Sequence, residues 1–181
     1  GGGLSLSGVG HAMSIGAGRL FLRSNTGNPF DVHVHTGINA RRYLLGLDGL
    51  SVKTKAMALL SWSTGPEVYY LDETLNWPLV GESESDSDVP DSQEAMLGAI
   101  AASIHELPEV DLRELTISIE KVRLPDSGQI PIKLAYRYIE KGYDPEALFE
   151  LTATLVCRDD QSEMHAYKLQ QASYEEYHET L

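Results

Sequence analysis

The fold prediction starts from residues 30–37, which read Phe-Asp-Val-His-Val-His-Thr-Gly. Apolar and polar side chains alternate along this stretch, as they do along a strand with one buried face. The apolar members are Phe30, Val32 and Val34. The polar members are Asp31, His33 and His35. Because alternate side chains of a strand point to opposite faces, we expect the first set to face a core and the second set to share the other face.

The rest of the chain shows more of this alternation, with one clear helical segment. Residues 93–107 place apolar side chains at helical spacing, and Pro108 ends the segment. A meander of strands is predicted after it, at residues 115–124, 130–138, 148–157 and 164–169. Residues 51–62 fit a strand or a helix equally well. We therefore expect an α+β protein, with a mostly antiparallel sheet and one main helix packed on it.

Two segments have compositions that do not suit a folded core. Residues 1–12 are rich in Gly and Ser, and we expect them to be vector-derived or disordered. Residues 82–93 alternate Ser with Asp and Glu and include no basic residue, which predicts a mobile acidic loop. We expect residues 13–181 to form a single α+β domain that this loop interrupts, because neither half alone holds many apolar residues.

Charge and composition narrow the classes of function. The formal net charge is -13, which disfavours nucleic acid and anionic membrane surfaces as partners. No apolar run approaches the length of a membrane span. The single cysteine, Cys157, cannot form an internal disulfide, which favours a reducing compartment. We expect an acidic, cytoplasmic protein that binds no nucleic acid and no membrane.

The histidines of residues 30–37 are the candidate metal ligands. On a strand, His33 and His35 lie about 7 Å apart on one face, where two imidazoles can converge on one metal ion. Asp31 shares that face and supplies a third, oxygen ligand. The alternative interpretation is a solvated strand face that carries polar side chains and binds no metal or other cofactor.

Two metal-dependent families share part of this pattern. Gly27, His33 and His35 have the spacing that opens the first cupin motif, and the stretch resembles that motif, although Asn39 or Ala40 stands where a cupin supplies a glutamate. The resemblance implies a cupin-like metal-dependent enzyme that uses the His-x-His strand. Residues 31–35 also resemble the first strand of amidohydrolases, whose barrel needs about 250 residues.

Tyrosines are concentrated in the last third of the chain and are the candidate interface residues. They are Tyr136, Tyr138, Tyr143, Tyr167, Tyr174 and Tyr177. We find no complete set of catalytic residues, which favours a non-catalytic protein over an enzyme. The first hypothesis is a protein-binding or assembly module that acts through a sheet face or edge, with a protein partner or a second copy of itself. The cupin-like metal enzyme is the alternative, and a small-molecule pocket between helix and sheet is a third possibility.

Overall fold

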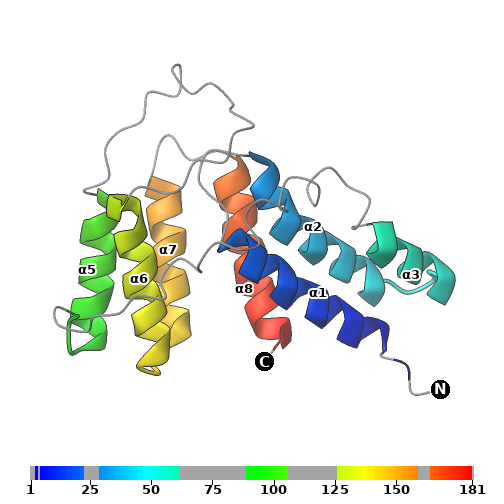
Figure 1. Cartoon of the computed structure of the whole chain (residues 1–181), viewed down its shortest axis with the longest axis horizontal. Helices are drawn as coiled ribbons and strands as arrows, with labels where there is room; N and C mark the ends of the chain where they lie inside the picture. The colour runs from blue at the N-terminus through cyan, green and yellow to red at the C-terminus, as the bar shows by residue number, and fades with distance from the viewer. Residues whose placement is uncertain are drawn as a thin grey trace.

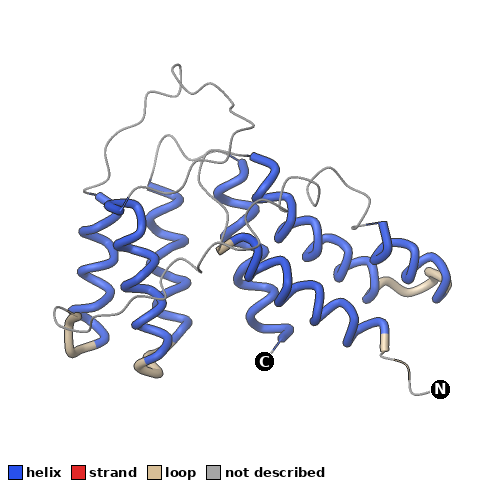
Figure 2. The backbone as a smooth tube through the Cα atoms, in the orientation of Figure 1, coloured by secondary structure: helices blue, strands red, loops and turns tan. Residues whose placement is uncertain are grey.

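The computed structural model describes residues 3, 5–22, 29–61, 89–105, 126–158 and 164–180, with the side chains of residues 29–31, 126–128 and 180 excepted. Within these ranges the chain forms helices and no strand (Figures 1 and 2). The helices are α1 (Leu6–Phe21), α2 (Pro29–Gly46), α3 (Val52–Leu60), α5 (Gln93–His105), α6 (Asp126–Glu140), α7 (Pro145–Arg158) and α8 (Met164–Thr180).

The prediction of an α+β protein with an antiparallel sheet is therefore wrong. The strand predicted at residues 30–37 is part of α2. The strands predicted at 130–138, 148–157 and 164–169 belong to α6, α7 and α8. The predicted main helix is confirmed as α5, and residues 52–60 resolve to helix rather than strand. The strand predicted at residues 115–124, and residues 82–88 of the predicted acidic loop, lie outside the described residues.

Helix α6 shows why the alternating pattern misled. Its apolar side chains at positions 130, 132, 134, 136 and 138 fit a strand, but Leu134 and Tyr138 are also four residues apart, which places them on one side of a helix. Tyr138 is fully buried, whereas Ile130 and Tyr136 are exposed. A short apolar run can satisfy both periodicities, and only packing against the neighbouring helices selects between them.

The described helices form two groups that α8 connects. Helices α1, α2 and α3 pack together, and α5, α6 and α7 pack together beside them (Figure 1). Helix α8 lies between the groups and contacts α2 on one side and α7 on the other. The prediction of one domain over residues 13–181 concerns the whole chain and stays a prediction. Helix α1 begins at Leu6, so residues 6–12 are helical, while their suggested vector origin remains a hypothesis.

The core of the first group forms where α1 crosses α2. Ala17 of α1 and Val34 and Ile38 of α2 are fully buried against one another. Met13 and Leu20 pack around them. Val34 and Ile38 are four residues apart and so project from one side of α2. Burying each of these side chains contributes roughly 1.5–3 kcal/mol, which fixes α2 on α1.

The core of the second group forms between α5 and α6. Met96 and Ile100 of α5 pack against Tyr138 of α6, and all three are buried. The Tyr138 hydroxyl donates a hydrogen bond of 2.6 Å to the carbonyl oxygen of Asp144, just beyond the α6–α7 turn. Gly142 in this turn has a φ of 71°, a left-handed conformation that glycine adopts at low cost. This turn joins α6 to α7.

Aromatic side chains join α7 to α8. Phe149 of α7 lies edge-on to Tyr174 of α8, with ring centroids 5.3 Å apart, and it also contacts Tyr177. The imidazole Nε2 of His178 lies 2.9 Å from a carboxylate oxygen of Glu146. These contacts hold α8 on the second group while its other side faces α2.

Candidate functional site

Helices α2 and α8 run in the same direction, and a cleft opens between residues 33–41 of α2 and the first turns of α8. Successive contacts pair His33 with His165, Asn39 with Glu175, and Arg42 with Glu179. The cleft has a volume of about 710 Å³, which is in the range of small-molecule sites. Its lining residues are His33, Thr36, Gly37, Asn39, Ala40, Arg41, His165, Tyr167, Lys168 and Gln171.

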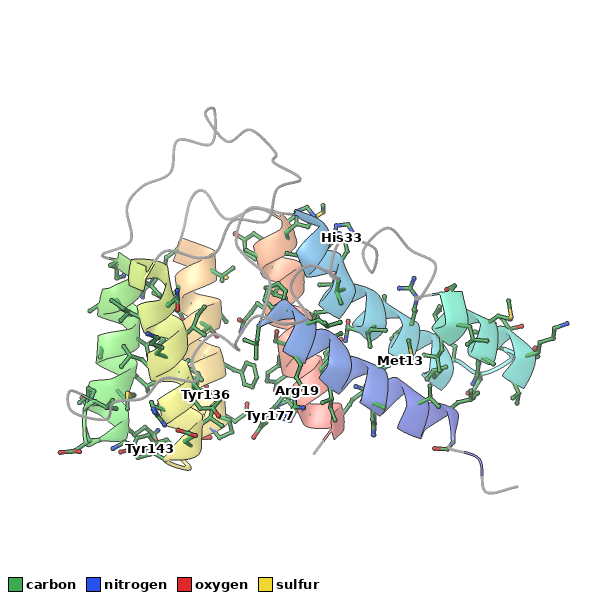
Figure 3. All side chains as sticks on the ribbon, in the orientation of Figure 1. Met13, Arg19, His33, Tyr136, Tyr143 and Tyr177 are labelled. Carbon is green, nitrogen blue, oxygen red and sulfur yellow. The ribbon has the colours of Figure 1, made fainter. Side chains whose placement is uncertain are left out.

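Two imidazoles meet in this cleft. The Nε2 atoms of His33 and His165 lie 3.3 Å apart, and the ring centroids lie 5.4 Å apart. The two residues are 132 positions apart in the sequence. Figure 3 shows His33 near the beginning of α2, beside the first turns of α8. The contact therefore exists only because α8 returns to pack on α2.

The prediction that His33 and His35 share one face of a strand is wrong, because both residues lie on helix α2. Successive residues of a helix are about 100° apart, so residues two apart point in nearly opposite directions. His33 faces the cleft, whereas His35 packs toward α8, with its Nε2 atom 3.5 Å from the Ser173 hydroxyl. The side chain of Asp31 lies outside the described residues, and metal binding by Asp31, His33 and His35 stays a prediction.

His35 is a half-buried histidine beside the cleft. Burial lowers the pKa of its imidazole below the usual 6.5, and the nearby negative charge of Glu176 opposes this shift only in part. Its Nδ1 atom is buried and has no hydrogen-bond partner among the described residues. An imidazole in these surroundings is stable in its neutral form. We therefore assign His35 to the packing between α2 and α8 rather than to the lining of the cleft.

A buried ion pair forms the base of the α2–α8 contact. The Arg42 guanidinium bonds the Glu176 carboxylate, and both side chains are almost fully buried. A second nitrogen of Arg42 lies 3.0 Å from Glu179, which is largely exposed. The Asn39 amide donates to Glu175 at 2.9 Å and to Glu176 at 3.3 Å. This network fixes the relative position of the two helices and thus of the two imidazoles above it.

Hydrogen bonds tie Glu175 to the wall of the cleft. Gln171 donates to its carboxylate at 2.6 Å, and Asn39 donates at 2.9 Å. These two bonds lower the pKa of the Glu175 carboxyl, and the small cost of burial works against them. Glu175 is not among the described lining residues of the cleft. Its carboxylate holds two lining residues, Asn39 and Gln171, in place.

The charge of this cleft sets it apart from the other described cavities. His33, Arg41, His165 and Lys168 line it, and no Asp or Glu is among its described lining residues. A cavity of about 400 Å³ contains Arg42 together with its partner Glu179. A cavity of about 390 Å³ contains the ion pairs Arg137–Glu140 and Lys141–Asp91. The groove of about 260 Å³ between α1 and α3 is lined by apolar side chains. Of these four cavities, the α2–α8 cleft combines cationic lining residues with no described acidic lining residue.

Basic residues are also concentrated in the N-terminal part of the sequence, and acidic residues in the rest. Residues 1–61 contain six Lys or Arg and two Asp or Glu, whereas the rest of the chain contains eight and twenty-five. The cleft therefore lies where the basic N-terminal part of a strongly acidic protein meets α8.

The six candidate interface tyrosines lie in different surroundings in the structure. Tyr138 is fully buried and belongs to the core. Tyr143 lies against it and donates a hydrogen bond of 2.8 Å to the carbonyl oxygen of Asp91. Tyr174 and Tyr177 pack on Phe149, Tyr136 is exposed, and Tyr167 lines the cleft. Binding of a protein partner or of a second copy of the chain through the exposed tyrosines, Tyr136, Tyr167 and Tyr174, stays a prediction.

Sequence reasoning missed Arg41, His165 and Lys168 as site residues. The helical character of α2 has a signal in the sequence, because Val34, Ile38 and Arg42 recur every four residues once the window extends beyond Gly37. The meeting of His33 with His165 has no such signal, because it depends on tertiary packing.

The described helices and the comparisons with known proteins add two findings. None of the helices in the described ranges has both the length and the apolar character needed to cross a lipid bilayer. Comparisons of the chain with family models, with curated proteins and with solved structures gave no significant match.

Proposed function

We propose that the protein binds a small, negatively charged molecule in the cleft between α2 and α8. The observation that carries this proposal is the lining of the cleft. Arg41 and Lys168 face it together with two imidazoles, and no described lining residue is acidic. In a protein of net charge -13, such a region attracts small anions while the rest of the surface repels them. This hypothesis replaces the sheet-edge module and the cupin-like enzyme, since the described residues contain no sheet.

The direction of helix α8 supports the same ligand class. His165, Tyr167 and Lys168 belong to the first turns of α8, and His33 belongs to the first turns of α2. Helix α8 presents the positive end of its dipole near the cleft, which adds to the charge of the side chains. The Tyr167 hydroxyl and the side chains of Thr36 and Gln171 provide polar contacts for the rest of the ligand.

The test is a calorimetric titration with inorganic phosphate and with citrate, in a buffer that contains EDTA and at constant ionic strength. The variant Lys168→Gln removes a charge from the cleft, and we expect it to weaken binding by about tenfold, or 1.4 kcal/mol. The matched control is Lys53→Gln, which removes an exposed charge from α3, outside the lining of the cleft. We expect the control to bind as the wild type does. Equal losses in the two variants, or no binding of either anion, would refute the proposal.

A further inference from the structure

The two imidazoles of the cleft are placed as ligands of a metal ion are placed. A tetrahedral zinc ion binds histidine nitrogens at about 2.0–2.1 Å, so two such nitrogens lie about 3.3–3.4 Å apart. The Nε2 atoms of His33 and His165 are 3.3 Å apart. Each imidazole comes from a different packed helix, and the helices are held by the buried Arg42–Glu176 pair. The separation is thus fixed by the packing and needs little rearrangement to accept an ion.

We propose that His33 and His165 bind a divalent transition metal ion, of the class of Zn²⁺, Cu²⁺ and Ni²⁺, at the wall of the α2–α8 cleft. Neutral imidazole nitrogen suits these ions better than it suits Mg²⁺ or Ca²⁺, which prefer oxygen ligands. This ligand pair differs from Asp31, His33 and His35, because it takes its second nitrogen from α8. Both residues also line the cleft, so an ion between them is accessible from it.

An ion between the two imidazoles faces the cleft, because both imidazoles line it. Within the described ranges, no group of three or more His, Cys, Asp or Glu side chains is placed to hold an ion. A metal ion that takes two imidazole ligands accepts water or an oxygen of a bound anion as a further ligand, as metal sites do when they bind ligands directly. Arg41 and Lys168 lower the affinity for a bare cation, so we expect weaker binding than at a site with three or four protein ligands.

The metal site and the anion site support each other. An anion that binds the metal ion with one oxygen places its remaining charge toward Arg41 and Lys168. Each ligand then raises the affinity for the other by the same factor. Only this coupling between the metal ion and the anion rests on the proposed function. The binding of the ion by the two imidazoles does not depend on it.

The test is a titration of metal-free protein, without a histidine tag, with Ni²⁺ and with Zn²⁺. We expect one site, and a loss of about thirtyfold or more in affinity in His33→Ala and in His165→Ala, since each removes half of the protein ligands. The matched control is His105→Ala, at the exposed end of α5. Circular dichroism verifies that each variant keeps its helices, and the visible spectrum of Co²⁺ reports the coordination geometry.

Three outcomes would overturn the inference. Both variants could bind the ions as tightly as the wild type, or the wild type could bind neither ion. In the third outcome His35→Gln and Asp31→Asn abolish binding while His165→Ala does not, and the ligands are then those predicted from the sequence. The phosphate titration in EDTA is separate from these measurements. Failure of anion binding with a normal metal titration refutes the proposed function alone, and the reverse result refutes the metal site alone.

Discussion

The buried ion pair between α2 and α8 gives the sharpest test of the packing. The variant Glu176→Gln keeps the shape of the side chain and an oxygen that Asn39 can bond, but it removes the charge that Arg42 faces. The side chains of Arg42 and Glu176 are 5% and 6% exposed. Removing one member of such a pair costs about 3–5 kcal/mol, because the other charge stays buried without its partner.

For Glu176→Gln the expected cost in unfolding free energy lies at or just below the lower bound of that range. Arg42 retains Glu179, whose carboxylate lies 3.0 Å away but is 64% exposed. A largely exposed partner contributes at most about 1 kcal/mol. We therefore expect Glu176→Gln to lower the free energy of unfolding by about 2–3 kcal/mol. The matched variant Glu179→Gln removes the exposed partner of the same guanidinium, and we expect a loss of about 1 kcal/mol or less.

Urea unfolding followed by far-ultraviolet circular dichroism measures both values. The wild type and the two variants are compared at one pH and one ionic strength, and the slope of the unfolding free energy against urea verifies that the unfolded states are comparable. Equal losses in Glu176→Gln and Glu179→Gln would refute the reasoning, because burial would then not distinguish the two contacts.

Three further predictions concern single side chains. Ile38→Ala should lower the free energy of unfolding by about 2–5 kcal/mol, against less than about 0.5 kcal/mol for exposed Val52→Ala, in the same urea assay. Since burial lowers the pKa of His35 in the folded protein, its contribution to stability is complete above about pH 6.5 and is lost as the pH falls through the lowered pKa. His35→Gln should therefore lose less stability than the wild type between about pH 7 and pH 5, and an equal loss would contradict this assignment. Tyr138→Phe should cost about 1 kcal/mol, because it removes the hydrogen bond to the Asp144 carbonyl, and an unchanged thermal midpoint would argue against that bond.

Part of the fold could be predicted from the sequence, and the reasons differ between elements. Helix α5 was recognisable because its apolar residues recur only at helical spacing and Ser92 precedes it as a capping residue. The turns at Gly49 and Gly142 have a signal in the sequence, because Asp-Gly and a glycine shortly before Asp-Pro are typical of turns, and in the structure both glycines have positive φ. In α6 and α7 the apolar residues fit both periodicities, so the sequence alone could not exclude strands.

The candidate site was predictable only in part. His33 was identified for its chemistry, but it was paired with His35 through a strand geometry that α2 does not have. His165 belongs to the same site because α8 packs beside α2 across 132 positions of sequence. Arg41 and Lys168 belong to it for the same reason. No local pattern encodes such contacts, which arise when the buried faces of helices far apart in the chain combine.

The meeting of His33 and His165 is the central claim, and nuclear magnetic resonance tests it directly. A nuclear Overhauser spectrum of protein labelled at histidine, with ring signals assigned from His33→Ala and His165→Ala, reports on the distance between the two rings. The structure predicts a cross-peak between their ring protons, because the Nε2 atoms are 3.3 Å apart. A spectrum with both rings assigned and no cross-peak between them would contradict the α2–α8 cleft and the proposals built on it.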